Sequence, residues 1–85
     1  MSDVMNIVEH KSAVPYLEAR GLLKQYKKAK HILASGDRSR VYFKERQPQG
    51  SDVWSFRINK QFRAFGYFRD DGTFVVAEIS NHQRS

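Results

Sequence analysis

The sequence has no cysteine, only two prolines, and no apolar run approaching the ~20 residues of a membrane-spanning helix. The lack of cysteine excludes disulfides, thiolate metal sites and a cysteine nucleophile. Residues Met1–His10 lack the basic stretch and apolar core of a secretion signal. We therefore expect a soluble, cytoplasmic protein without a membrane partner. Its 85 residues suit a single domain over residues 1–85.

Acidic residues are scarce relative to basic ones. Nine Asp and Glu oppose fifteen Lys and Arg, which gives a net charge of +6 and a pI near 9.9. A pI above about 9 is typical of domains that bind polyanions. The expected partner is a nucleic acid or an acidic protein, and the alternative is a soluble protein that is simply basic. The sequence has no metal-ligand spacing and no Gly-rich phosphate loop, so no cofactor is expected.

The first half of the chain predicts helices. Ser12 is the expected N-cap of a first helix, with Pro15 in its first turn and Gly21 near its end. Residues Leu22–Ser35 form the clearest helix, because apolar side chains recur at helical spacing. These apolar residues are Leu22, Leu23, Tyr26, Ala29 and Leu33. The lysines between them form either a solvated face or an extension of a phosphate-binding track.

The second half changes to the period of two that is typical of strands. We expect strands at Arg40–Arg46, Asp52–Asn59, Phe62–Arg69 and Thr73–Asn81, with Asp70-Asp71-Gly72 as a hairpin turn. The short connections predict an antiparallel meander, and the apolar helix stripe requires one face of that sheet. The predicted fold is therefore α+β: an N-terminal helical hairpin packed on one face of a three- to four-stranded antiparallel sheet.

Alternation then divides the sheet residues between two faces. The expected core residues are Trp54, Phe56, Ile58, Val75, Ala77 and Ile79. Val41 and Phe43 share one face of the first strand, and the small residues Ala64 and Gly66 would let a helix approach closely. Met5, Ile7 and Val8 form either a short edge strand or an ordered arm.

The opposite face is predicted to be rich in cations and aromatic rings. It gathers Arg57, Arg63, Phe65, Tyr67, Arg69, Glu78, Ser80 and His82, joined by Tyr42, Lys44 and Arg46. Cations bind phosphates and rings stack on bases, so this combination favours single-stranded RNA over duplex DNA. Alternatively, the arginines pair with Glu45, Asp52 or Glu78, the rings lie in a covered core, and the histidine is an ordinary surface residue.

Two segments resemble a known family. The run Trp54–Phe65 is similar to the central hairpin of the RelE/ParE superfamily of bacterial toxins, and Phe74–Gln83 is similar to its final strand. The resemblance covers about residues 11–83. It implies a RelE-like fold and the toxin of a bacterial type II toxin–antitoxin pair, akin to RelE, YoeB and HigB.

The resemblance also implies an activity. RelE-like toxins act as ribosome-dependent mRNA endoribonucleases, in which the RNA's own 2′-hydroxyl attacks and no metal takes part. The implied partners are a cognate antitoxin protein, the ribosome and mRNA. The alternative within the same fold is a ParE-like gyrase inhibitor without catalysis, or a binding module for RNA or protein.

The resemblance implies roles for particular residues. Arg63 would clamp the scissile phosphate, His82 would act as general acid or base, and Glu45 is a plausible base. The implied RNA-binding residues are Lys44, Arg46, Arg57, Phe65 and Tyr67.

The match departs from the family at one catalytic position. Gln83 stands where a tyrosine is common, and glutamine cannot act as a general acid. On alternation alone, Lys44 and Glu45 point to opposite faces, so at most one of them enters the site unless a bulge intervenes.

Overall fold

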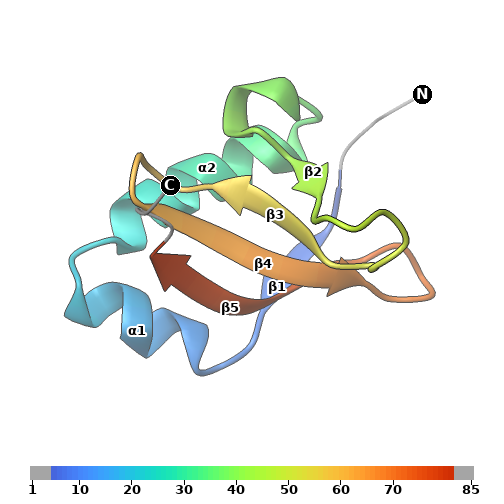
Figure 1. Ribbon diagram of the computed structural model, residues 1–85. Coiled ribbons are helices and arrows are strands. Elements are labelled where there is room, and N and C mark those ends of the chain that lie inside the picture. Colours follow the sequence, from blue (N-terminus) through green and yellow to red (C-terminus); the bar gives the residue numbers. More distant parts are fainter. Residues whose placement is uncertain (1–4, 82–85) are drawn as a thin grey trace.

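The computed structural model describes residues 5–81, which form two helices, a short 3₁₀ helix and five strands. In chain order these elements are β1 (Ile7–Glu9), α1 (Ala13–Ala19), α2 (Leu23–Ala34), η1 (Ser39–Val41), β2 (Lys44–Glu45), β3 (Trp54–Arg57), β4 (Phe62–Phe68) and β5 (Phe74–Asn81). The strands form one sheet in the order β1-β5-β4-β3-β2, and α1 and α2 cover one of its faces (Figure 1). No helix within residues 5–81 has both the length and the apolar character needed to cross a membrane.

The sheet confirms the predicted meander and extends it by one strand. Strands β2 to β5 are antiparallel neighbours. Strand β1 pairs in parallel with β5, with Ile7 opposite Phe74, so the sheet is mixed and five-stranded rather than three- or four-stranded and antiparallel. The buried side chain of Ile7 joins the core beneath the helices, which explains why this short segment is held as a strand.

The helices form as the apolar spacing predicts. Tyr26, Ala29 and Leu33 are buried along one stripe of α2, and Leu22 is buried just before it. Pro15 lies in the first turn of α1, as expected. Ser12 precedes α1 but makes no capping hydrogen bond with its side chain, so the predicted N-cap is wrong in that respect.

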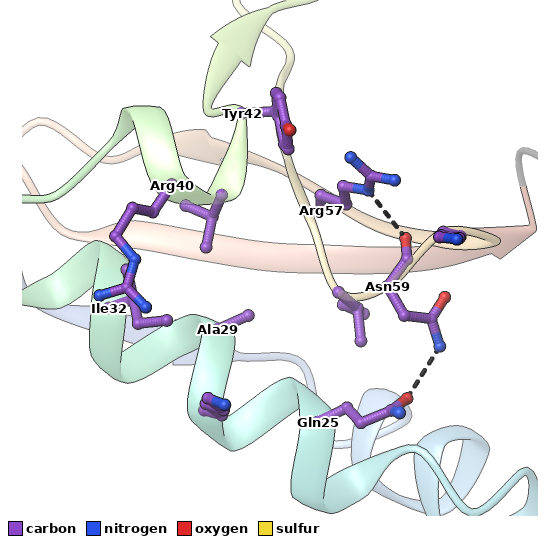
Figure 2. A pocket seen from close by; sticks show the side chains of 11 residues that line it. Gln25, Ala29, Ile32, Arg40, Tyr42, Arg57 and Asn59 are labelled. Atoms are coloured by element: carbon purple, nitrogen blue, oxygen red, sulfur yellow. Dashed lines mark hydrogen bonds between the residues drawn. The ribbon is translucent and has the colours of Figure 1, made fainter.

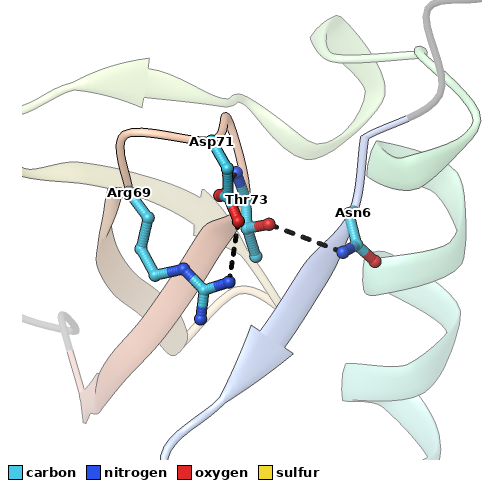
Figure 3. Close-up of polar contacts among 4 residues, drawn as sticks. All are labelled: Asn6, Arg69, Asp71 and Thr73. Carbon is cyan, nitrogen blue, oxygen red and sulfur yellow. Dashed lines mark hydrogen bonds and ion pairs between the residues drawn. The ribbon is translucent and has the colours of Figure 1, made fainter.

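The β4–β5 hairpin turns at the predicted Asp-Asp-Gly sequence. Gly72 has φ +88°, a left-handed conformation that glycine adopts without steric cost. Asp71 accepts a hydrogen bond from the Thr73 backbone N–H at 2.9 Å and pairs with the Arg69 guanidinium at 2.9 Å (Figure 3). These contacts, the Arg69 hydrogen bond above all, hold the pKa of Asp71 well below its ordinary value. Arg69 is therefore engaged in the turn rather than offered to a ligand on the sheet face.

Asn6 connects this turn to the start of β1. Its Nδ2 donates to Thr73 Oγ1 at 3.5 Å (Figure 3). Its backbone carbonyl accepts a hydrogen bond from the Phe74 N–H at 2.9 Å. The hairpin end is thereby tied to the edge strand.

The predicted strand Arg40–Arg46 is mostly wrong. Its first part is η1, and Tyr42 follows with φ +52°, a left-handed conformation that breaks the extended backbone. The Phe43 N–H bonds back to the Arg38 carbonyl at 3.1 Å, which closes a helical turn. Of the predicted strand, only Lys44–Glu45 is extended, and it forms β2. Val41 is nonetheless buried in the core, and Phe43 stacks on Trp54 with ring centroids 5.1 Å apart.

A bulge changes the predicted core of β5. Phe65 pairs with Glu78 and Gly66 with Val76, so Ala77 is an extra residue on β5. Before the bulge Phe74 and Val76 face the core. Val75, which pairs with Tyr67, therefore lies on the opposite face, and Ala77 is exposed.

The rest of the predicted core is largely as expected. Phe56, Ile58 and Ile79 are buried in it, and Trp54 packs against it while partly buried. The prediction that Gly66 admits a helix is wrong, because the space beside it holds the Val75 carbonyl and the Phe74 ring.

Candidate nucleic-acid interface

The face of the sheet away from the helices carries most of the predicted site. Residues paired across neighbouring strands point to the same face. Arg57 pairs with Arg63, which in turn pairs with Ser80 on β5. Further along, a row runs across four strands and consists of Lys44, Ser55, Phe65 and Glu78. The structure thus brings Lys44, Arg57, Arg63, Phe65 and Tyr67 onto one face.

Arg63 is held at the centre of this face by two acceptors. Its Nε and Nη2 donate to Ser55 Oγ at 3.3 and 3.0 Å, and Nη2 also donates to the Tyr42 carbonyl at 3.1 Å. Partial burial, followed by the nearby charge of Arg57, lowers the pKa of Arg63 from its ordinary value. Within residues 5–81 no acceptor contacts Nη1, so its N–H groups are available for an oxyanion.

Arg57 is held less tightly. Its Nε donates to the Asn59 carbonyl at 3.3 Å, and its guanidinium carbon lies 4.7 Å from the centroid of the Tyr42 ring. In the described part of the chain neither Arg57 nor Arg63 lies within 4.0 Å of a carboxylate. The alternative in which these arginines pair with Glu45, Asp52 or Glu78 is therefore not what the structure shows.

A hollow of about 400 Å³ opens beside Arg63 at the β2 edge of the sheet. It is lined by Lys44, Glu45, Arg46, Gln47, Ser55, Arg63 and Phe65. The hollow therefore brings together Glu45, the predicted base, and Arg63, the predicted phosphate clamp. Two further cations, Lys44 and Arg46, line it as well.

Glu45 lines this hollow, and its carboxylate is held by the loop that follows β2. Its Oε2 accepts the backbone N–H groups of Gly50 at 3.0 Å and Asp52 at 3.1 Å. These bonds hold the carboxylate against the loop at 47–52, which joins β2 to β3. Glu45 and Lys44 both line the hollow, although Lys44 pairs with Ser55 and Glu45 with Trp54, on opposite faces of the strand as alternation predicts.

The two aromatic candidates differ in access. The Phe65 side chain is buried, with 7% exposed, and the Arg46 guanidinium lies 5.4 Å from its ring centroid. Tyr67 is 41% exposed. Tyr67 is thus the ring that a base can reach, while Phe65 forms part of the floor that Arg46 covers.

The predicted histidine, His82, and its neighbour Gln83 lie outside the described residues. The strand that leads to them ends beside the site, since Ser80 pairs with Arg63 and Asn81 with Phe62. Within residues 5–81, no three His, Asp or Glu side chains gather as a set of metal ligands.

Two residues that position the arginines were not assigned a role from the sequence. Ser55 alternates onto the same face as Arg57, so its position was visible in the pattern. Tyr42 supplies the carbonyl for Arg63 and the ring for Arg57 because of its left-handed backbone, and no sequence signal indicates that geometry.

No protein-family model matches this chain, and no curated protein matches it either. Among solved structures it is similar to a chain in the crystal structure of the toxin–antitoxin complex RelBE2 from Mycobacterium tuberculosis. The identity is 19%, the match covers 95% of this chain and 94% of that chain, and the TM-score is 0.57. This likeness confirms the predicted RelE-like fold.

Proposed function

We propose that this protein is the toxin of a toxin–antitoxin pair and that it cleaves mRNA on the ribosome. The observation that carries the proposal is the Arg57–Arg63 pair on the sheet face away from the helices. Within residues 5–81 no carboxylate pairs with either guanidinium, and Arg63 lines the same hollow as Glu45. The proposal is supported by the fold shared with a chain of a toxin–antitoxin complex.

The reaction is an internal transfer at one phosphate of the RNA. The 2′-oxygen forms a bond to phosphorus while the bond to the 5′-oxygen breaks, which leaves a 2′,3′-cyclic phosphate and a 5′-hydroxyl. One proton leaves the 2′-hydroxyl and another reaches the departing 5′-oxygen. Extra negative charge develops on the phosphoryl oxygens, and preorganised donors at that point lower the barrier most.

Arg63 is positioned to supply those donors. Ser55 and the Tyr42 carbonyl fix one side of its guanidinium, and Nη1 remains for the phosphate. Arg57, the neighbour across the strands, adds a second cation. A fixed guanidinium costs little reorganisation when charge develops, which favours the transition state over the ground state.

Glu45 is the proposed base. The two backbone N–H groups on Oε2 orient the carboxylate, and within residues 5–81 no donor contacts Oε1. That free oxygen can take the proton from the 2′-hydroxyl. His82, which follows the end of β5, is the proposed acid that protonates the 5′-oxygen.

The remaining predicted residues would hold the RNA on either side of the cut. Lys44 and Arg46 line the hollow and would bind flanking phosphates. Exposed Tyr67 would stack on a base. Phe65 would support this surface from below. The proposed partners are therefore the ribosome with its mRNA, and an antitoxin that keeps the protein inactive in the cytoplasm.

The test uses purified full-length protein with ribosomes translating a defined message. We expect new 5′-hydroxyl ends within the translated region and 2′,3′-cyclic phosphates on the upstream fragments. Arg63→Ala should lower the cleavage rate at least 100-fold, since it removes the phosphate clamp. The matched control, Lys24→Ala, removes an exposed helix cation and should leave the rate unchanged.

An intact message, or cleavage that is equal in the wild type and Arg63→Ala, would overturn the proposal. Supercoiling by DNA gyrase, measured on the same preparations, identifies the non-catalytic alternative: inhibition of gyrase with an intact message would place the protein with ParE-like inhibitors.

A further inference from the structure

The turn between β4 and β5 contains a chemically reactive pair of residues. Asp71 is the only Asp or Asn in the sequence that is followed by glycine. Glycine has no side chain that would shield its backbone nitrogen or restrict its conformation. In an Asp-Gly pair this nitrogen can therefore attack the carboxyl group of the aspartate and close a five-membered succinimide ring.

The conformation of the turn requires both members of this pair. The Arg69 N–H donates to the Thr73 carbonyl at 2.8 Å, so the loop consists of residues 70–72. Hairpin loops of this length commonly end in a left-handed residue, and Gly72 has φ +88°. Asp71 Oδ1 accepts the Thr73 N–H at 2.9 Å, which closes the turn through a side chain. The fold therefore keeps a reactive sequence at an exposed position.

Arg69 restrains both of the groups that would react. Its guanidinium pairs with Asp71 Oδ2 at 2.9 Å, and this hydrogen bond is the main cause of the low pKa of Asp71 (Figure 3). The carboxyl group therefore stays ionised, and an ionised carboxylate resists attack because it cannot leave as water. The backbone carbonyl of Arg69 also accepts the Gly72 N–H at 2.9 Å, which keeps the attacking nitrogen in the turn.

The turn between β3 and β4 provides a comparison. Asn59 is held there by its Nδ2, which donates to Gln25 Oε1 on α2 at 2.8 Å (Figure 2). Its Oδ1 accepts two backbone N–H groups of the same turn. The next residue is Lys60, whose side chain hinders attack by its own backbone nitrogen. Asn59 is therefore protected twice, by its contacts and by its neighbour, whereas Asp71 depends on its contacts alone.

We propose that Asp71 is a latent site of isoaspartate formation and that Arg69 protects it. When the ion pair is lost, the Gly72 nitrogen forms a bond to Asp71 Cγ, and a Cγ–O bond breaks as water leaves. Water then opens the succinimide at one of its two carbonyl carbons. Cleavage of the bond between Cγ and nitrogen restores aspartate, and cleavage of the bond between the main-chain carbonyl carbon and nitrogen gives isoaspartate. Water is the only other reactant.

Isoaspartate at this position would change the hairpin. The main chain would then run through the former side-chain carboxyl group and would be longer by a methylene group. The contact between Asp71 and the Thr73 N–H depends on the original geometry, and Thr73 also contacts Asn6, which precedes β1. The modification would therefore loosen this end of the hairpin and its connection to the edge strand. This inference does not depend on the proposed function.

The test follows purified full-length protein during incubation at neutral pH and physiological temperature for several weeks. Methylation by protein L-isoaspartyl methyltransferase with radiolabelled S-adenosylmethionine measures the isoaspartate, and electron-based fragmentation of tryptic peptides locates it. The same chain unfolded in urea gives the rate without restraint. We expect the folded wild type to react at least about tenfold more slowly, since each unit by which the pKa falls leaves tenfold less neutral carboxyl group.

Variants identify the protecting group. Arg69→Ala removes the guanidinium and keeps the backbone carbonyl, so it should raise the rate at Asp71 at least about fivefold. Arg69→Lys retains a cation and should remain closer to the wild type. Arg20→Ala, the matched control, removes an exposed arginine at the end of α1 and should leave the rate unchanged. Asp71→Glu should abolish the signal, because a glutamate would have to close a six-membered ring, which forms far more slowly.

Urea titration of each variant separates local protection from global stability. It gives the unfolded fraction, and that fraction multiplied by the unfolded rate is the isoaspartate that global unfolding alone would produce. An excess over this amount in Arg69→Ala supports the proposal. The proposal is wrong if that excess is absent, if the folded wild type reacts as fast as the unfolded chain, if Arg20→Ala reacts as fast as Arg69→Ala, or if the product lies at another residue.

Discussion

Arg57 and Arg63 lie directly opposite each other on β3 and β4, and within residues 5–81 neither guanidinium has a carboxylate partner. Like charges at directly opposed positions destabilise a sheet. Contacts with Tyr42, Asn59 and Ser55 hold the pair in place. We expect this arrangement to cost stability in the free protein, and we expect an anion that binds between the two cations to relieve that cost.

The first prediction follows from this pair. Inorganic phosphate at about 10 mM should raise the Tm of the wild type by several degrees, because a ligand that binds the folded state stabilises it. In Arg57→Gln the rise should be at most half as large, since one of the two cations is gone. Differential scanning fluorimetry at constant ionic strength measures both values.

Lys24→Gln is the matched control, because it removes one exposed cation from α2, which lies on the other side of the sheet. Its response to phosphate should equal that of the wild type. An equal response in Arg57→Gln would mean that the arginine pair is not an anion site.

The second prediction separates the structural and chemical roles of Glu45. Glu45→Gln keeps an oxygen that can accept from Gly50 and Asp52, but it removes the basic carboxylate. We expect cleavage to fall at least 100-fold in this variant, with unfolding free energy changed by less than about 0.5 kcal/mol. Glu45→Ala loses the loop contacts as well and should be less stable by about 1–2 kcal/mol. Urea unfolding and mRNA end mapping provide the two measurements.

If Glu45→Gln cleaves as fast as the wild type, Glu45 serves the loop alone and another group takes the proton. If both variants lose the same stability, the hydrogen bonds to Oε2 do not survive the change to an amide, and Glu45→Asp becomes the test of the base.

The sequence predicted the fold best where the signals are local. The apolar stripe around Tyr26 and Leu33 defines α2, and Gly72 defines the last hairpin. It left β1 open between a short edge strand and an ordered arm, because three residues carry little pattern and their partner in β5 lies more than sixty residues away. It failed at Ala77. One extra residue in a strand moves all residues on one side of it to the other face of the sheet, and no feature of the sequence signals that extra residue.

In the candidate site, too, the sequence predicted the features that depend on local patterns and missed the others. Alternation correctly placed Arg57, Arg63 and Tyr67 on one face, because β3 and β4 pair without a break over that stretch. It could not show that the Glu45 carboxylate is bonded to the backbone of Gly50 and Asp52, because those contacts depend on the conformation of the loop. The backbone contact from Tyr42 to Arg63 depends on a left-handed residue that propensity does not predict.

The third prediction concerns pH and the contact between β1 and α2. Glu9 accepts hydrogen bonds from Tyr26 at 2.6 Å and Lys30 at 3.0 Å. Partial burial by itself would raise the pKa of Glu9, but the two hydrogen bonds and the lysine charges outweigh it, so the pKa lies below its ordinary value of 4.5. The carboxylate therefore adds stability above pH 4.5, and this contribution is lost as the pH falls through the folded-state pKa.

Glu9→Gln should be less stable than the wild type by about 1 kcal/mol at pH 7, given the partial exposure of the pair. The difference should shrink as the pH falls below the ordinary pKa of a glutamate. Urea unfolding between about pH 3 and pH 7 measures it. Glu18→Gln, at an exposed position on α1, should show no such trend. A difference between Glu9→Gln and the wild type that stays constant with pH would show that the charge of Glu9 contributes nothing.

The fourth prediction concerns Gly66, which lies beside the bulge. A Cβ at this position would clash with the carbonyl carbon and oxygen of Val75 and would touch the Phe74 ring. Neither the carbonyl nor the buried ring can move aside easily, since the first is paired backbone and the second lies in the core. The absence of a side chain at Gly66 is therefore what allows β5 to bend toward β4 there.

Gly66→Ala should lower the unfolding free energy by about 3 kcal/mol, near the upper end for overpacked positions, and should disturb the residues that the bulge exchanges between faces. Gly21→Ala is the control: Gly21 has φ +68° and open space on the side where a methyl group would lie, so the change should cost about 1 kcal/mol of backbone strain. Urea unfolding gives both values, and amide chemical shifts should change around Val75 in Gly66→Ala alone. Equal losses in the two variants would mean that the strand relaxes around the methyl group, and the bulge would not depend on glycine.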